Sequence, residues 1–233
     1  MKLCRGIIVP VLFAAGLLTA GCGGAGPAGA HGSSPTAESM SQVLPAVEAA
    51  VDAAQSVHVA GTVPVGSQTD TVDLSLASPL SISGSITQGG NTLSLVVADG
   101  SYYLQITTSS MKFAKVSPPD CGTVCGKYVE LPASDTKEFA ADFTIRGFFK
   151  DAFAAIPSSA RHNTADIWLP TTYHGQPALK ASITGDTIVV ARRTLYLLDV
   201  AASNGDHVVF SDWNSVPPIA PPPASDVVSL GGL

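Results

Sequence analysis

Apolar and polar residues along this chain follow first a helical period and then a strand period. Between residues 40 and 54, apolar residues recur every three or four positions, which predicts a helix with one apolar face. From Val57 onward they alternate with polar residues, as is typical of antiparallel strands buried on one face. The strands expected in this half lie at 72–76, 80–86, 93–97, 102–106, 113–116 and 127–131. Turn sequences at 88–91 and 99–100 make this half a meander.

The second half of the chain begins with a helical region and returns to strands. A capping-box pattern at 135–138 starts the helical region, which Pro157 is expected to stop. The strands expected after it lie at 165–172, 177–184, 187–191, 194–200 and 207–213. Ten or eleven antiparallel strands in one sheet tend to curl. The predicted fold class is therefore α+β, with a single wide, curled antiparallel sheet (a half β-barrel) wrapped around a few helices.

The start of the chain has the pattern of an export signal. Lys2 and Arg5 precede an apolar run over residues 7–20, which is short for a membrane-spanning helix. Small residues then precede Cys22, as in the lipobox at which lipoproteins are cleaved and acylated. The alternatives are an ordinary secretory signal and a retained anchor helix. We predict a signal peptide at 1–21 and diacylglyceryl attachment to Cys22, whose two chains suffice for stable anchoring.

The chain after Cys22 divides into a tether and one domain. Residues 22–36 are rich in Gly, Ser and Pro and are expected to form a flexible tether, and residues 37–233 form the domain. The expected location is the outer face of the bacterial plasma membrane. Loss of the two positive charges before Cys22 takes the formal net charge from −6 to −8. An acidic exported domain is a poor nucleic-acid binder.

Two of the four cysteines remain to pair within the folded domain. Cys4 leaves with the signal and Cys22 is acylated, so Cys121 and Cys125 are left in an oxidising compartment. We predict a local disulfide between them. A redox pair and half of a metal site are the alternatives, although redox pairs usually have two intervening residues and no histidine stands at a matching offset for zinc.

A search for catalytic motifs gives no candidate. The chain has no G-x-S-x-G elbow, no H-E-x-x-H and no P-loop, and its five histidines are scattered. We therefore predict a protein that is not an enzyme and has neither a metal nor a cofactor.

The order of these elements resembles the LppX/LprAFG family of actinobacterial lipoproteins and, more distantly, the outer-membrane lipoprotein carriers. The resemblance covers most of residues 37–230 and rests on the sequence of elements rather than on one motif. Its parts are the Cys22 lipobox, the tether, the helix 40–54 leading into 56–61, the meander 81–106, and the 210–213 segment followed by prolines. The cysteine loop and the 135–156 block do not map onto the family.

The resemblance implies a half-barrel that encloses an apolar cavity and carries acylated envelope lipids. An acylated lipid, the plasma membrane reached through Cys22, and an envelope transporter or other protein are the expected partners. The residues expected to line the cavity are Leu80, Ile82, Leu93, Leu95, Leu104, Phe148 and Phe149. The alternative for all of them is plain core packing. A sensor or accessory lipoprotein that binds another protein, and an envelope enzyme, remain as the other two hypotheses.

Overall fold

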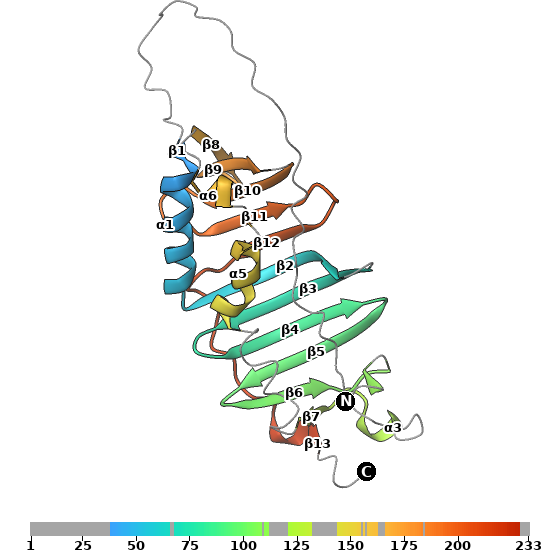
Figure 1. The fold of residues 1–233 in the computed structure, drawn as a ribbon. Coiled ribbons are helices and arrows are strands. Elements are labelled where there is room, and N and C mark those ends of the chain that lie inside the picture. Colours follow the sequence, from blue (N-terminus) through green and yellow to red (C-terminus); the bar gives the residue numbers. More distant parts are fainter. Residues whose placement is uncertain are drawn as a thin grey trace, which may run out of the picture.

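One continuous twisted sheet carries the whole fold, with helices packed on one of its faces (Figure 1). The structure is a computed structural model. It describes residues 38–65, 68–108, 110–111, 121–131, 144–154, 156, 158–162, 166–183 and 185–228. Cys22, the tether, the expected strand 113–116 and the capping box at 135–138 lie outside these residues.

The sheet has 13 strands among the described residues. In spatial order they are β1 (Glu38–Ser39), β8 (Asp166–Tyr173), β9 (Gln176–Ile183), β10 (Asp186–Ala191), β11 (Leu197–Ala201), β12 (His207–Ser211), β2 (Ser56–Val65), β3 (Gln68–Ala77), β4 (Ser81–Gln88), β5 (Asn91–Ala98), β6 (Ser101–Gln105), β7 (Tyr128–Glu130) and β13 (Val227–Val228). Two meanders, β2–β7 and β8–β12, meet where β2 pairs with β12 in the middle of the sheet. The predicted wide sheet with few helices is confirmed.

The helices are few and short. They are α1 (Met40–Ala53), α3 (Cys121–Val124), α5 (Ile145–Ala154), α6 (Ser158–Arg161) and the 3₁₀ turn η2 (Ala224–Asp226). The helix predicted at 40–54 is therefore confirmed, and Pro45 lies inside it. No helix in the described part of the chain is long and apolar enough to span a membrane.

Some element bounds differ from those expected. The strands β1 and β13 are two residues long, too short to show an alternation. Because β13 runs parallel to β7, the sheet is mixed at one edge and antiparallel elsewhere. The strand expected from Thr194 begins only at Leu197, since a turn precedes it. Helix α6 follows Pro157, where the helical region was expected to stop.

The two faces of the sheet differ in polarity, as the alternation predicted. We call the face that packs against α1 and α5 the inner face and the opposite one the outer face. The inner face carries the main core, in which Val57, Leu74 and Leu76 are almost fully buried beside the apolar face of α1. On the outer face of β3 and β4, Ser75 pairs with Ser83 and Asp73 with Ser85. Around β2–β5 burial is therefore concentrated on the inner face. On β9–β11 the outer face has a smaller buried cluster of its own, formed by Ala178, Val189, Ala191 and Leu198.

Two glycines in the strands allow neighbouring backbones to approach closely. Gly84 in β4 has φ of +140°, and a Cβ there would lie 2.0 Å from the carbonyl oxygen of Asp73 in β3. Gly61 in β2 has φ of +148°, and a Cβ would lie 2.0 Å from the carbonyl oxygen of His207. A side chain at either position would push the paired strand away.

We predict that Gly84→Ala destabilises the fold by about 2–5 kcal/mol, because it adds both backbone strain and an atomic clash. Gly90→Ala is the matched control: its φ is also positive, at +82°, but no atom lies within 4 Å of the added Cβ. The control should cost only about 1 kcal/mol. Urea unfolding of both variants measures the difference, and equal losses would contradict the close approach at Gly84.

Candidate lipid-binding face

Strand register brings four of the predicted cavity residues together on the inner face of β4–β6. Leu93 lies opposite Ile86, and Leu95 lies between Gly84 of β4 and Leu104 of β6. Ile82 follows on the same face, opposite Val97. Alternation alone placed these side chains on one face, and the register makes them neighbours.

The burial of these side chains varies. Ile82 is fully buried and Leu104 is 5% exposed, whereas Leu80, Leu93 and Leu95 are only half-buried. The half-buried leucines keep apolar surface that the described protein atoms do not cover. That these leucines line a cavity stays a prediction.

Polar groups lie on the inner face at the ends of β3 and β4. Asp70 is 1% exposed and accepts a hydrogen bond from the Gln88 side chain at 2.9 Å. Its other carboxylate oxygen, Oδ1, has no hydrogen-bond partner among the described residues. Burial raises the pKa of Asp70, and the Gln88 hydrogen bond opposes that shift. A buried carboxyl oxygen without a hydrogen-bond donor lowers the stability of the fold. A ligand that donates a hydrogen bond to Oδ1 would remove this penalty.

Tyr102 of β6 adds a second polar group beside the leucines. It lies opposite Val97 on the inner face and is half-buried. Burial raises the pKa of its hydroxyl, so it stays a neutral hydroxyl under physiological conditions. The inner face is therefore mainly apolar, with a few uncharged or partly satisfied polar groups.

Helix α5 contributes the two predicted phenylalanines to an aromatic cluster. Phe149 is 2% exposed, and its ring centroid lies 5.2 Å from that of Phe210 and 5.8 Å from that of Trp213. Phe148 is half-buried and meets Phe149 edge-on at 5.4 Å. Phe149 is thus a core residue, whereas Phe148 lies at the core's rim. Phe149 belongs to the main core, against which Phe148 and Leu95 both pack, whereas Leu93 packs against the second, smaller core.

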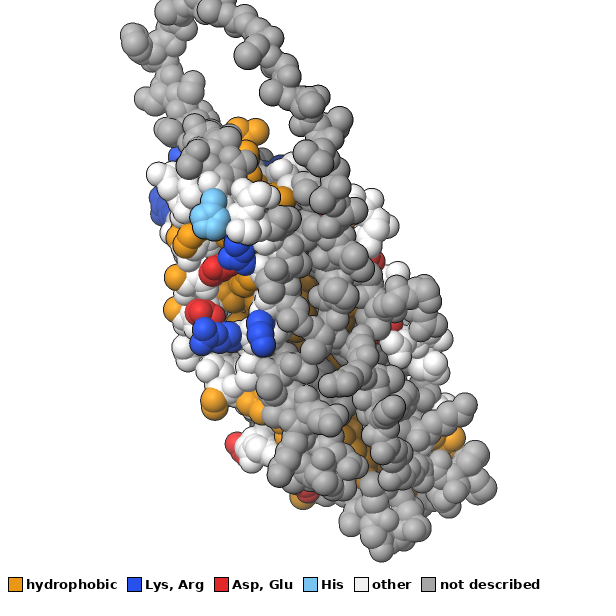
Figure 2. All heavy atoms as spheres, viewed as in Figure 1, with side chains coloured by type: hydrophobic (Ala, Val, Ile, Leu, Met, Phe, Trp, Pro, Cys, Tyr) orange, Lys and Arg blue, Asp and Glu red, His pale blue; other side chains and the backbone are white. Residues whose placement is uncertain are grey.

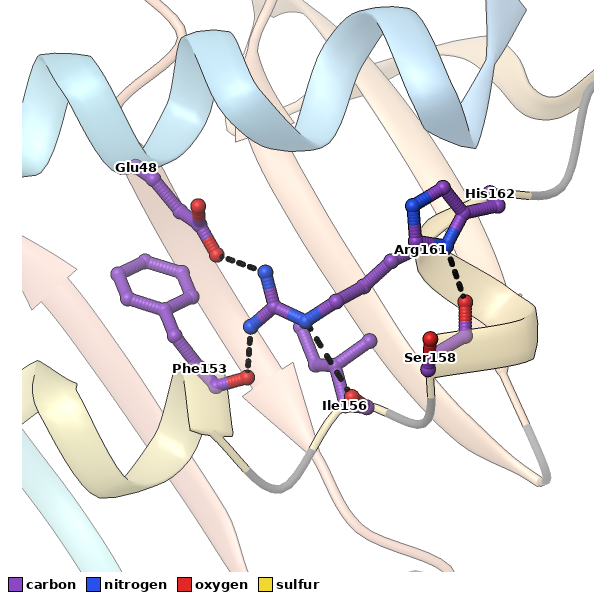
Figure 3. A network of polar contacts seen from close by, with 6 residues as sticks. All are labelled: Glu48, Phe153, Ile156, Ser158, Arg161 and His162. Carbon is purple, nitrogen blue, oxygen red and sulfur yellow. Dashed lines mark hydrogen bonds and ion pairs between the residues drawn. The ribbon is translucent and has the colours of Figure 1, made fainter.

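Arg161 joins the helices on this face to one another (Figure 3). Its guanidinium is 2.6 Å from Oε1 of Glu48 in α1 and also donates to the carbonyl oxygens of Phe153 and Ile156. Those carbonyls lie at and just beyond the end of α5, where helix carbonyls lack partners within the helix. One side chain therefore holds α1, α5 and α6 together. Local sequence patterns carry no signal for this contact, because Glu48 and Arg161 are 113 residues apart.

The predicted disulfide is present. Cys121 and Cys125 are bonded across α3, with their Cα atoms 4.7 Å apart. Cys125 packs against a second small core that contains Leu104, Ile106 and Val129. Among the described residues, no group of three or more His, Cys, Asp or Glu side chains could hold a metal ion. The cysteine loop therefore supports the margin of the sheet near β6 and β7.

Comparison with known proteins finds similarity among solved structures. No protein-family model matches this chain, and no curated protein matches its sequence. The crystal structure of the lipoprotein LppX from Mycobacterium tuberculosis is similar, with 13% sequence identity, 78% of this chain and 98% of LppX covered, and a TM-score of 0.45. The expected resemblance to an LppX-type protein is thus found in a solved structure. The fold class itself follows from the sheet described above.

We predict that Arg161→Met destabilises the protein by about 1–3 kcal/mol, because it removes charge-assisted hydrogen bonds to partly buried groups. The matched control is Arg146→Met. Arg146 also reaches α1, at 3.5 Å from Asp52, but the two side chains are 81% and 49% exposed. An exposed pair contributes little, so the control should change the unfolding free energy by less than about 1 kcal/mol. Equal effects in urea titrations would contradict the role of Arg161.

Proposed function

We propose that this chain is an exported lipoprotein that binds the acyl chains of envelope lipids against the inner face of its sheet and carries or presents them. The observation that carries the proposal is the row of half-buried apolar side chains on the inner face of β5, namely Leu93 and Leu95, the second of which lies opposite Gly84 of β4. Leu is among the residues most often fully buried, so two adjacent half-buried leucines on one face leave apolar surface that an acyl chain could cover.

The width of the sheet supports the same conclusion. At about 4.8 Å between strands, 13 strands span roughly 58 Å. A helix with its side chains is about 10 Å wide, and the 14 residues of α1 extend over only about 21 Å. The described helices cannot cover the inner face alone. The rest of that face must be covered by other chain segments or by a ligand.

The free energy of acyl-chain transfer requires a protein with an extended apolar binding face. Burial of one CH₂ group is worth about 0.8 kcal/mol, so a chain of about 16 carbons requires roughly 13 kcal/mol of apolar contact to leave a bilayer. A host can lift such a chain only if its binding face is nearly as apolar as the bilayer. The alternating Leu, Ile and Val positions of β4–β6 provide such a face.

The polar end of the face offers a place for a headgroup. The Asp70 oxygen that has no donor among the described residues would accept a hydrogen bond from a hydroxyl or amine of the lipid. The nearby Gln88 amide already holds the other oxygen of the same carboxyl group. We therefore place the headgroup toward Asp70 and the acyl chain along β4–β6.

The proposed anchor and location depend on the N-terminal segment. We propose that residues 1–21 are removed, that Cys22 is acylated, and that residues 22–36 tether the domain 37–233 to the outer face of the plasma membrane. A two-chain anchor on a flexible tether would keep the inner face within reach of the bilayer from which a lipid is taken.

We predict that residues 37–233, purified from a lipid-rich bacterial host, carry about one acyl lipid per chain in native mass spectrometry. This segment contains every described element. Leu93→Asn combined with Leu95→Asn should remove most of the bound lipid, because two amides would replace apolar contacts on the inner face.

Leu169→Asn is the control for this experiment. Leu169 of β8 is 57% exposed, and its partner Lys180 lies on the outer face, so the substitution should leave the lipid in place. A lipid-free mass together with no uptake of a fluorescent fatty acid would contradict the proposal. That result would favour the sensor or accessory lipoprotein that binds another envelope protein.

A further inference from the structure

A cleft of about 350 Å³ lies at the ends of strands β8–β12, apart from the leucines of β4–β6. Three turns form it: the β8–β9 hairpin turn, the turn between β10 and β11, and the segment that follows β12. The lining used below consists of Tyr173, Gln176, Thr194, Tyr196, Asp212 and Trp213. This volume lies within the range of sites that hold small ligands.

The backbone is unusual in these three turns. Of the five non-glycine residues with positive φ among the described residues, four are His174 (46°), Leu195 (57°), Asp212 (51°) and Asn214 (58°). All four lie in or beside the cleft. This conformation is least favourable for a bulky residue such as Leu195. Disfavoured conformations that gather in one place, and that the surrounding structure holds, are characteristic of binding sites.

Hydrogen bonds hold the turns in this arrangement. The Asn214 side chain accepts from the backbone N–H of Gln55 at 2.6 Å and donates to the Tyr196 hydroxyl at 2.6 Å. Its backbone N–H also donates to the carbonyl oxygen of Ser56 at 2.9 Å. The chain after β12 is thereby fixed to the start of β2, and Tyr196 is fixed to both.

Ring stacking fixes Tyr196 further. Its ring lies parallel to that of Trp213, with centroids 4.7 Å apart and an angle of 6°, and Trp213 in turn stacks on Phe149. The indole N–H of Trp213 donates to the carbonyl oxygen of Leu197 at 2.7 Å. One face of the Tyr196 ring is therefore covered by Trp213, and the half-buried ring is held rigidly at the cleft wall.

The charges around the cleft narrow the choice of ligand. Asp212 lines the cleft, is exposed, and has no ion-pair partner among the described residues. It disfavours an anionic ligand. Arg192 and Arg193 are exposed in the turn between β10 and β11 and disfavour a cationic one. A ligand without net charge meets neither penalty.

The nearby acid Asp199 is already satisfied. It accepts from the Tyr173 hydroxyl at 3.0 Å and lies 2.7 Å from Nε2 of His207. Burial, together with the hydrogen bond to Asp199 and its charge, raises the pKa of Tyr173 to about 12. Tyr173 therefore remains a neutral hydroxyl at the cleft wall at physiological pH.

We propose that this cleft binds a neutral saccharide. A sugar ring has an apolar C–H face, which would lie against Tyr196, and hydroxyl groups, which would exchange hydrogen bonds with Asp212, Gln176 and Thr194. The rigid aromatic wall matches the apolar face of such a ligand, and the polar groups of the cleft match its hydroxyls. This site is separate from the proposed acyl-chain face and does not depend on it.

Saturation-transfer NMR on the purified full chain, in polyoxyethylene detergent micelles, tests the proposal. The probes are maltose, cellobiose, lactose and α-1,2-mannobiose, with glucuronic acid and glucosamine as charged counterparts. We expect saturation transfer to the ring C–H protons of at least one neutral disaccharide and weaker transfer to both charged sugars. Signals from the headgroup of dodecyl maltoside in the same micelles, without signals from free maltose, would assign the cleft to glycolipid headgroups rather than to free oligosaccharides.

Three variants locate the contact. Tyr196→Phe keeps the ring and should retain binding, whereas Thr194→Arg should weaken it at least about tenfold by filling the cleft from an exposed position that makes no core contact. Arg193→Ala lies in the same turn but does not line the cleft, and it should leave binding unchanged. Absence of signal from every neutral probe, preference for a charged sugar, or binding that survives Thr194→Arg would each overturn the proposal.

Discussion

The structure depends on one constraint, the burial of the apolar inner face of the sheet. The sheet is far wider than the helices that pack on this face. In β2–β5 apolar and polar positions alternate, so these strands place their apolar side chains on the inner face. In β9–β11 the outer face also has a small buried cluster, formed by Ala178, Val189, Ala191 and Leu198. Helix α1 covers part of that face with its own apolar side, and α5 adds Phe149. On β5 the leucines are only half-buried, so their apolar surface is available for contact with an apolar ligand.

The space-filling view is consistent with this description. Figure 2 shows orange apolar surface between charged side chains beside the helices, and further orange surface toward the β6–β7 end of the molecule. The charged groups include the ion pairs that join α5 and α6 to α1. Polar contacts thus hold the helices in place from outside, while the apolar contacts lie beneath them. The inner face is therefore apolar over most of its area, with polar side chains such as Asp70 and Gln88 at its edge.

Much of the fold could be predicted from the sequence, because its signals are local and periodic. The alternation at residues 93–97 and the three- and four-residue spacing at 40–54 each specify an element and its buried face. The pairing of Cys121 with Cys125 followed from the predicted export and from the predicted removal of Cys4 and acylation of Cys22. The two-residue strands β1 and β13 could not be found, since they exist only through pairing with distant strands.

The candidate sites were less predictable, because they depend on tertiary contacts. Nothing in the local sequence connects Arg161 to Glu48, or Asn214 to Tyr196. The positive φ of Leu195 has no sequence signature, since leucine rarely adopts it. The alternation pattern identified the inner-face leucines as apolar strand positions. Their half-buried state could not be predicted, because it depends on which segments pack against the inner face.

The proposed acyl-chain site on the inner face is tested most directly by mapping where a bound acyl chain contacts the sheet. Palmitic acid that carries a photoreactive diazirine is bound to the purified chain and irradiated, and the adducts are located by tandem mass spectrometry. We expect adducts at Leu93, Leu95 and Leu104, which face inward, and not at Ser94 or Tyr103, which face outward between them. Adducts spread over both sets, or confined to the outer face, would contradict an acyl-chain site on the inner face.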